Sequence, residues 1–496
     1  MSLNQNQGQG QTQKRCWNCR QQKIACDKTL PHCRNCLKRG RQCLGYGLKL
    51  SWPRKGDQRR SASVRKEHFI IPIRSSDTNF INATSDDVKA SQERALSRYD
   101  PTTIGEVWLT RQPHFNMARL DPFLASHTWS PVARLVSSSQ SGDELYGLLV
   151  RMSFQDETLP SLASRYAISA LSYQHLAMDK TAVMHQTRAI RALQTAIETA
   201  VPSECMQLMA ASMLLNIYET LNFETSDLSW SIFFCGTKRI ANFVTKTDDT
   251  YFGDEALIID WIFYHDVMYK FSIRHWREKN KDQIQLASQR KVLSKAVFSP
   301  ERQVIAPILG CSLELLDLLC QIIDAVYEPG DPECRSESHL KLLRSLEIRL
   351  KYLQQRQSTV APLDSPESTR ETTVAELYRL AAIVYLLRMA KGEPETARCV
   401  LEAVGQAYET LNRLGHCERP WPLFVIALEA RSEEHRRDVL RVLKRSLARR
   451  PLGSMALVNR MVPDAWTQQD LRGSSVDPFT LYGMIISRHR VPPCFT

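Results

Sequence analysis

The chain of 496 residues is poor in glycine and contains no long apolar run. Its 19 glycines are about half the usual share of ~7%, which disfavours turn-rich all-β folds. A membrane helix needs about 18 apolar residues in a row, so no membrane partner is expected. Residues 1–13 are Gln-rich and lack the apolar region of a secretory signal. We therefore expect an intracellular chain whose thiols stay reduced.

Catalytic motifs are also absent. The sequence has no H-E-x-x-H, no G-x-S-x-G and no Walker lysine loop, so we expect no enzyme. His265 and His275 lie in a helical pattern that favours structural histidines over metal ligands. Cys311 and Cys320 could act as redox sensors, but buried, inert thiols are the ordinary case.

Positive charge is concentrated at one end of the chain. The net charge is +12, and residues 1–74 alone hold 17 Lys and Arg against 3 Asp and Glu. The remaining residues are close to neutral. This asymmetry favours an N-terminal module that binds a polyanion, with a solubilising or targeting tail as the alternative.

Six of the 14 cysteines lie within 28 residues, in the pattern C-x2-C-x6-C-x6-C-x2-C-x6-C: Cys16, Cys19, Cys26, Cys33, Cys36 and Cys43. The pattern consists of two equivalent halves offset by 17 residues. Two tetrahedral zinc ions need eight sulfur bonds, which six thiolates supply only if two of them bridge both ions. A segment of about 30 residues cannot fold on its own core, so metal binding should supply its folding energy.

Other uses of these cysteines are less well supported. A disulfide scaffold needs an oxidising compartment, which nothing in the sequence indicates. Two separate four-ligand zinc fingers need eight ligands, and His32 is unsuitably spaced to help. A Cu(I)–thiolate cluster is chemically open, because soft thiolates also select Cu(I).

The segment that contains these cysteines resembles the Zn2Cys6 binuclear cluster of fungal transcription factors. The resemblance rests on the six cysteines and on the residues that match at Arg20, Lys23, Asp27 and Pro31. It implies two Zn2+ per chain, with Cys16 and Cys33 as the bridging thiolates. The sequence departs from the common pattern at Gln22 and Ala25, where many relatives carry basic residues.

The resemblance also implies how the module would read DNA. The residue that matches Lys23 contacts the guanines of a CGG-type triplet in this family, and Lys or Arg against guanine is the commonest specific contact. Equivalents of Arg20 and Lys28 bind phosphates, and Lys14 and Arg15 add positive charge. We expect residues 20–25 to form about two helical turns, which would put Arg20 and Lys23 on one face. Gly40 takes the place of Lys23 in the second half.

We expect a disordered Gln-rich tail over 1–13, the DNA-binding module over 14–46 and a basic flexible linker over 47–105. A large all-α regulatory domain is expected over 106–475, followed by a C-terminal tail over 476–496. No a/d heptad repeats between 47 and 110, so a homodimer would need another surface. Residues 364–376, which carry acids among Ser and Thr, could form an activation segment, but a solvated loop is the ordinary interpretation.

The all-α prediction rests on amphipathic stripes with helical spacing. Apolar residues step by three or four from Met206 to Leu221, from Trp261 to Phe271, from Leu377 to Leu387 and from Leu401 to Leu411. Several of these segments resemble the helical regulatory domain that accompanies the zinc cluster in fungal factors.

The sequence therefore predicts a nuclear, sequence-specific regulator of RNA polymerase II genes, of the kind that controls metabolic or secondary-metabolite gene clusters. Its expected partners are duplex DNA with CGG-like half-sites and transcription machinery or co-regulators. The alternatives are a chromatin-tethered helical enzyme and a metal-buffering thiolate protein.

Overall fold

The computed structural model describes residues 15–29, 32–41, 43, 142–198, 201–221, 229–244, 253–277, 302–357, 366–449, 453–472, 477–489 and 492–496. The chain divides into two units, Met1–Ser91 and Gln92–Thr496. Lys14, the predicted linker over 47–105 and the segment searched for heptads over 47–110 lie outside the described residues.

The first unit contains two helices of five residues each, α1 (Trp17–Gln21) and α2 (Arg34–Lys38). Isolated helices of this length are not stable in water, so the contacts between them must supply their stability. Their buried residues form a separate small core that consists of cysteine side chains, with Ile24 packed against it.

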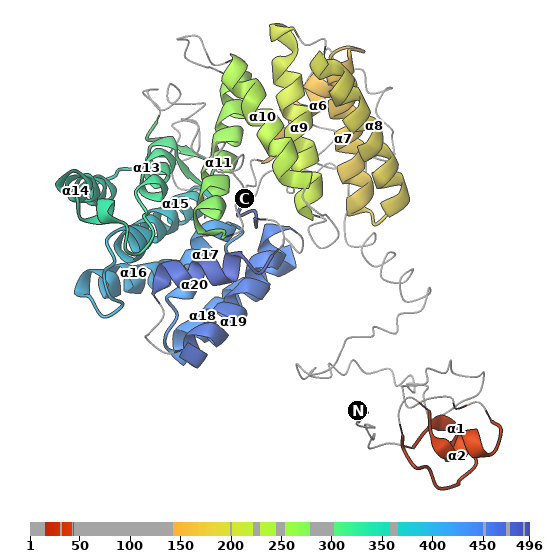
Figure 1. The fold of residues 1–496 in the computed structure, drawn as a ribbon. Coiled ribbons are helices and arrows are strands. Elements are labelled where there is room, and N and C mark those ends of the chain that lie inside the picture. Colours follow the sequence, from red (N-terminus) through yellow and green to blue (C-terminus); the bar gives the residue numbers. More distant parts are fainter. Residues whose placement is uncertain are drawn as a thin grey trace, which may run out of the picture. The chain divides into compact units, whose positions relative to one another are not determined.

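The second unit is helical and begins, in the described residues, with a group of five long helices (Figure 1). These are α6 (Gly142–Phe154), α7 (Leu159–His175), α8 (Asp179–Glu198), α9 (Cys205–Leu221) and α10 (Ser229–Val244), with a short 3-10 turn, η2 (Pro202–Glu204), before α9. Helix α11 (Gly253–His275) follows and contacts both this group and the helices after it.

The remaining elements form the second group, which is coloured teal to blue in Figure 1. A hairpin of β1 (Ile305–Ala306) and β2 (Cys311–Ser312) pairs Ile305 with Ser312 and Ala306 with Cys311, antiparallel. The helical elements are α13 (Leu313–Asp324), η4 (Pro332–Arg335), α14 (Glu337–Lys351), α15 (Pro366–Tyr385), the π-helical η5 (Leu386–Ala390), α16 (Arg398–Leu414), α17 (Pro420–Leu428), α18 (Glu433–Arg449), α19 (Ser454–Arg472) and α20 (Pro478–Ile486).

The prediction of a large all-α domain is confirmed, because each predicted stripe lies on a helix. Met209 and Met213 are buried on α9, and Trp261 and Phe271 are buried on α11. On α16 Val404, Tyr408 and Leu411 of the predicted stripe are buried, whereas Leu401 is exposed and its neighbour Val400 is buried instead. None of the described helices is long and apolar enough to span a membrane.

Two sequence expectations for boundaries in the helical unit differ from the structure. Residues 478–486, expected in a C-terminal tail, form α20, because Asp477 caps the helix by accepting from the N–H of Thr480 and the apolar side chains of Leu481 and Ile485 are buried. The expected solvated loop over 364–376 is helical from Pro366 onward, since proline is tolerated in the first turn of a helix.

Two ion pairs join α11 to its neighbours. The Lys238 ammonium on α10 donates to Asp266 on α11 at 2.6 Å, with both side chains almost fully buried. Four residues along α11, Lys270 donates to Asp324 on α13 at 3.0 Å. Removing one partner of a buried pair costs about 3–5 kcal/mol, so the Lys238–Asp266 pair fixes α11 against α10. The Asp324 side chain is 53% exposed, so its pair with Lys270 contributes less to holding α13.

The β1–β2 hairpin is held by a buried arginine. Arg419 donates to the carbonyls of Ile308 at 2.9 Å and Pro307 at 2.6 Å. Gly310 has a φ of +75°, and a Cβ there would lie 2.6 Å from Nε of Arg419. Glycine is therefore required at this position both for its backbone conformation and for the approach of Arg419.

Gly310→Ala should lower the free energy of unfolding by about 1–3 kcal/mol more than Gly392→Ala, because it also displaces hydrogen bonds of a charged group. Gly392 is a matched control, with a φ of +67° and open space where a Cβ would lie. Chemical denaturation of both variants measures the difference. Equal losses of unfolding free energy in the two variants would contradict this prediction, because Arg419 would then have moved away at no cost.

Candidate metal centre and nucleic-acid interface

The two halves of the cysteine pattern fold in the same way. Cys16 and Cys33 are the N-cap residues of α1 and α2. The Sγ of Cys16 accepts from the N–H of Cys19 at 3.4 Å, and the Sγ of Cys33 accepts from the N–H of Cys36 at 3.3 Å. Each helix start therefore turns both sulfurs of its C-x2-C pair toward one point.

The sulfur atoms gather into two overlapping sets of four. Cys16, Cys19, Cys26 and Cys33 form one set, and Cys16, Cys33, Cys36 and Cys43 form the other, with all ligand atoms of a set within 4.8 Å of one another. The two sets share Cys16 and Cys33, which are the two residues that the resemblance implies as bridges.

The sulfur spacing fits tetrahedral zinc. A Zn–S bond of about 2.3 Å places the sulfurs of a tetrahedron about 3.8 Å apart. The Sγ atoms of Cys16 and Cys33 are 3.5 Å apart, and the Cys16–Cys36 and Cys19–Cys33 pairs are each 3.7 Å apart. The residues present can therefore hold two Zn2+ ions, and the protein binds two.

Burial makes these sulfurs depend on a metal. Burial raises the pKa of the Cys16 thiol to about 12 and raises that of Cys33 further. Burial also acts to raise the pKa of Cys26, but backbone N–H groups of Cys16 and Lys28 outweigh it and bring this pKa to about 7. Thiolates packed this closely are stable only beside strong positive charge, which zinc supplies.

Helix α1 is shorter than the sequence predicts, and this is a correction. It ends at Gln21, where the N–H of Lys23 donates to the carbonyl of Arg20 at 3.3 Å and the N–H of Ile24 to that of Cys19 at 3.0 Å. This bond pair is a Schellman motif, which needs a left-handed residue after the helix. Lys23 takes that position with a φ of 55°. Arg20 and Lys23 therefore do not share a helical face.

The second half closes in the same way but with glycine. Gly40, at a φ of +62°, occupies the position equivalent to Lys23, and the same two hydrogen bonds form from Gly40 and Arg41. For an L-residue the left-handed conformation costs roughly 1–2 kcal/mol. The first half thus keeps a lysine where glycine would be more stable, and such strain is typical of a functional position.

A loop between the halves is pinned to α2 by Asp27. Its carboxylate accepts from the hydroxyl of Thr29 at 2.6 Å and from the N–H groups of Arg34 at 3.0 Å and Asn35 at 3.2 Å. The Thr29 hydroxyl, followed by these N–H groups, holds the pKa of Asp27 well below its usual range. The Asn35 amide donates back to the carbonyl of Ala25, which fixes the chain just beyond Lys23.

The roles of Asp27 and Asn35 are not apparent from sequence reasoning, although both residues lie in the matching pattern. The repeated asparagine in Cys-Trp-Asn-Cys and Cys-Arg-Asn-Cys is the signal that could have found Asn35. A contact from Arg41 to the Gln22 side chain also joins the halves.

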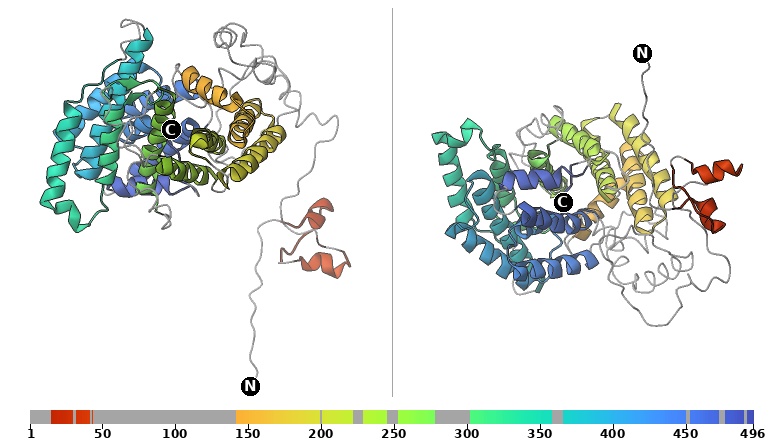
Figure 2. Two further views of the ribbon diagram at one scale, coloured as in Figure 1. Left: turned by 90° about the horizontal axis from the view of Figure 1, so that it is seen from above. Right: turned by 60° about the horizontal axis from the view of Figure 1, so that its bottom comes forward.

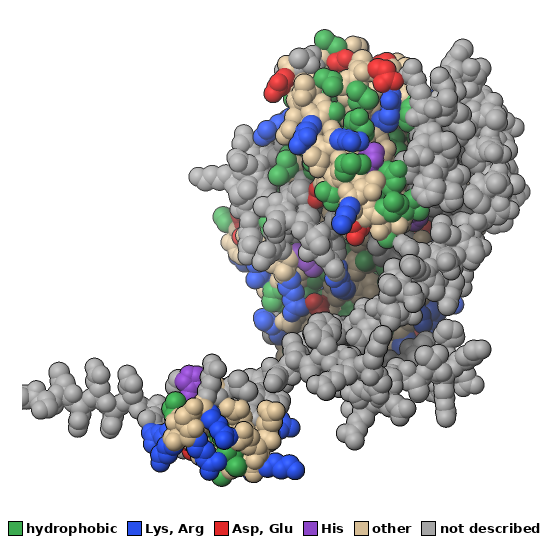
Figure 3. All heavy atoms as spheres, turned by 90° about the vertical axis from the view of Figure 1, so that its right-hand side faces the viewer, with side chains coloured by type: hydrophobic (Ala, Val, Ile, Leu, Met, Phe, Trp, Pro, Cys, Tyr) green, Lys and Arg blue, Asp and Glu red, His purple; other side chains and the backbone are tan. Residues whose placement is uncertain are grey.

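The predicted DNA-contacting residues lie on the surface of this module. Arg15, Arg20 and Lys23 are exposed, and Lys28 is half-buried with a φ of 59°. Figure 3 shows lysine and arginine side chains spread over the module. Asp27 is the single acid between residues 14 and 43 of the sequence, and its carboxylate accepts a hydrogen bond from the N–H of Arg34 on α2. The other charged side chains of this module are therefore positive.

The remaining candidates in the helical unit have structural surroundings. His265 Nδ1 lies 2.9 Å from the carbonyl of Trp261, and His275 Nε2 lies 2.7 Å from the hydroxyl of Tyr385. Cys311 and Cys320 are fully buried, and burial raises the pKa of Cys311 to about 12.

Comparison with known proteins agrees with the geometry. The fungal Zn(2)-Cys(6) binuclear cluster domain matches residues 14–53, and the fungal specific transcription factor domain matches residues 127–483. The second match spans well over half of the chain. The chain belongs to the fungal Zn2Cys6 transcription factors. It is therefore a DNA-binding, zinc-binding transcription factor.

Individual relatives resemble different parts of the chain. The transcription factor iacI of Pestalotiopsis fici is 24% identical over 356 residues, which cover 71% of this chain and 88% of that protein. The ustiloxin B cluster transcription factor ustR of Aspergillus flavus is 25% identical over 193 residues, 35% of this chain and 31% of that protein.

The acriflavine sensitivity control protein acr-2 of Neurospora crassa is 49% identical over 39 residues, 8% of this chain and 7% of that protein. No solved structure matches the chain.

The full-length protein should bind two zinc ions, and a strong chelator should unfold the module while the helical unit stays folded. Cys33→Ala removes a shared sulfur and should lose both ions, whereas Cys43→Ala should weaken only one. Elemental analysis and hydrogen exchange over residues 16–43 measure these effects. Loss of the same number of ions from both variants would contradict the shared-sulfur geometry.

Proposed function

We propose that the protein acts in the nucleus as a sequence-specific regulator of RNA polymerase II genes. It binds CGG-like half-sites through its zinc cluster and acts through transcription machinery or co-regulators. The observation that supports this most directly is the pair of overlapping sulfur sets, which present a strained, exposed Lys23 at the end of α1.

We propose the six cysteines as the zinc ligands and Lys23 as the base-contacting residue. Arg20 and Lys28 are proposed to bind phosphates, with Lys14 and Arg15 adding positive charge. The left-handed backbone and the exposed side chain of Lys23 support its role, because strain of this kind is typical of functional positions. Gly40 leaves the second half without a corresponding cation.

We further propose that the helical unit is regulatory and has no catalytic role, and that it extends through α20 instead of ending at residue 475. A gene cluster for a secondary metabolite is the proposed target, since ustR is named for the ustiloxin B cluster. The proposed boundaries of the DNA-binding module, 14–46, fall within the matched range 14–53.

Genome-wide occupancy of the tagged full-length protein tests the function. Site-specific peaks should disappear in Cys19→Ala, because one tetrahedron loses a sulfur, and should persist in the control Cys399→Ala, whose exposed thiol lies on α16. Peaks that persist in Cys19→Ala would mean that another surface binds chromatin.

Two substitutions at Lys23 separate the backbone strain at this residue from the contact of its side chain with DNA bases. Both Lys23→Ala and Lys23→Gly should lose about 1–3 kcal/mol of preference for the guanine positions in duplex-binding assays. Lys23→Gly should also stabilise the zinc-loaded module by roughly 1 kcal/mol, because glycine tolerates the left-handed conformation. Equal losses on CGG-containing and scrambled duplexes would contradict base reading by Lys23.

A further inference from the structure

Residues 492–496 lie inside the helical unit. Pro492, Pro493, Cys494 and Phe495 are all buried, and Phe495 is 0% exposed. In both views of Figure 2 the marked chain end lies among the surrounding helices, beside α11 and α17 in Figure 1. Residues 492–496 thus form no helix or strand, yet they lie in the interior of a unit that is mostly helical.

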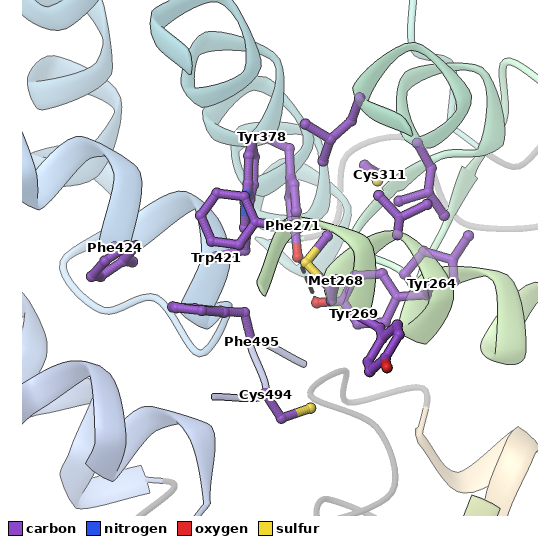
Figure 4. Packing of buried hydrophobic residues seen from close by; sticks show 14 of the residues in the cluster. Tyr264, Met268, Tyr269, Phe271, Cys311, Tyr378, Trp421, Phe424, Cys494 and Phe495 are labelled. Atoms are coloured by element: carbon purple, nitrogen blue, oxygen red, sulfur yellow. Dashed lines mark hydrogen bonds between the residues drawn. The ribbon is translucent and has the colours of Figure 1, made fainter. Parts of the chain in front are cut away.

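The ring of Phe495 packs among aromatic side chains, which we call the aromatic cage. Its ring centroid lies 5.1 Å from that of Phe271 on α11 and 4.9 Å from that of Phe424 on α17. Phe271 is in turn ringed by His275 at 5.3 Å, Tyr385 at 5.4 Å, Trp421 at 5.9 Å and Tyr482 at 6.1 Å. Figure 4 shows Phe495 facing the side chains of α11 and α17.

The segment is held mainly by one side chain, Phe495, in the way that a bound peptide is held by an anchor residue. Pro492 and Pro493 have no N–H, so they cannot add donors to a helix or sheet ladder. The carbonyl of Pro493 accepts a hydrogen bond from the hydroxyl of Ser272 on α11. The ring of Phe495 provides the anchoring contacts, and aromatic pairs are worth about 0.5–1.5 kcal/mol beyond their burial.

Two further features of the cage favour a binding site over an ordinary core. The π-helical turn η5 begins directly after Tyr385, and such turns are frequent at functional sites. The buried indole Nε1 of Trp421 has no hydrogen-bond partner among the residues that the structure describes. A buried donor left in this way is stabilised by a ligand that brings an acceptor.

The cage favours an uncharged ligand. The rings that contact Phe495 and Phe271 are mainly phenylalanine, tyrosine and tryptophan side chains. The buried charges of Arg388 on η5 and Glu429 already pair with each other at 3.1 Å. A charged ligand would enter this site without a counter-ion, which is costly.

We propose that residues 492–496 are a displaceable plug. They occupy a pocket of the helical unit that takes a flat, uncharged aromatic molecule with a hydrogen-bond acceptor, and such a molecule displaces the ring of Phe495.

The thiol of Cys494 reports displacement of the plug in the native, zinc-loaded, full-length protein. Iodoacetamide labelling, followed by mass spectrometry at each cysteine, should modify Cys494 at least about tenfold faster than Cys311, Cys320 and Cys417, because local opening needs less free energy than global unfolding. Those three thiols are fully buried controls. The plug is refuted if Cys494 reacts at the rate of Cys311 and with the same dependence on denaturant.

The ligand class is tested by competition. Benzamide has a flat ring and a carbonyl acceptor, and it should accelerate labelling of Cys494 in a saturable manner without affecting Cys311. Cyclohexanecarboxamide has the same amide without a flat ring and should have little effect. No acceleration by benzamide, or equal acceleration by both amides, would overturn the proposed ligand.

A variant links the two results. Phe495→Ala removes the anchor, so it should raise the Cys494 labelling rate at least about tenfold and abolish the effect of benzamide. Leu471→Ala is the control, since this side chain is 75% exposed. An unchanged Cys494 rate in Phe495→Ala would argue against the anchor. If Phe495→Ala does not fold, the competition in the unmodified protein still decides.

Discussion

The geometry of the DNA-binding module follows from a shortage of sulfur. Six thiolates must satisfy two tetrahedral ions, and only shared ligands can do so. Cys16 and Cys33 belong to both sets of sulfur atoms, and both are N-cap residues, so two ions held by these sets would tie the starts of α1 and α2 together. Two helices of five residues thereby acquire fixed positions that their own hydrogen bonds could not maintain.

The same constraint explains why a strained lysine is tolerated. The chain must leave α1 abruptly to bring Cys26 back to the ions, and a left-handed residue makes that turn. Glycine serves this purpose at Gly40, whereas the first half uses Lys23 at a cost of roughly 1–2 kcal/mol. Metal binding contributes about 10–16 kcal/mol to folding, several times this cost. The position of Lys23 can therefore carry a lysine for its side chain, even though glycine would be more stable there.

The sequence predicts the parts of this protein that depend on periodicity or on fixed spacing. The cysteine spacing predicts the pair of sulfur sets, and the apolar stripes predict α9 and α11, because both signals are local. The end of α1 at Gln21 is not predictable from helix propensity, since the return of the chain to the metal overrides it. The course of residues 492–496 depends on Phe271 and Phe424, which lie far away in the sequence.

Helix α11 is the element on which the packing of the helical unit converges. Asp266 fixes it to α10 through a buried ion pair, and Lys270 joins it to α13 through a pair with the partly exposed Asp324. Phe271, the next residue, contacts the ring of Phe495. Buried pairs are costly to break, so α11 shifts as a unit with its partners or remains in place. A change in the side chains that contact Phe271 would therefore affect α11, which connects the two groups of helices.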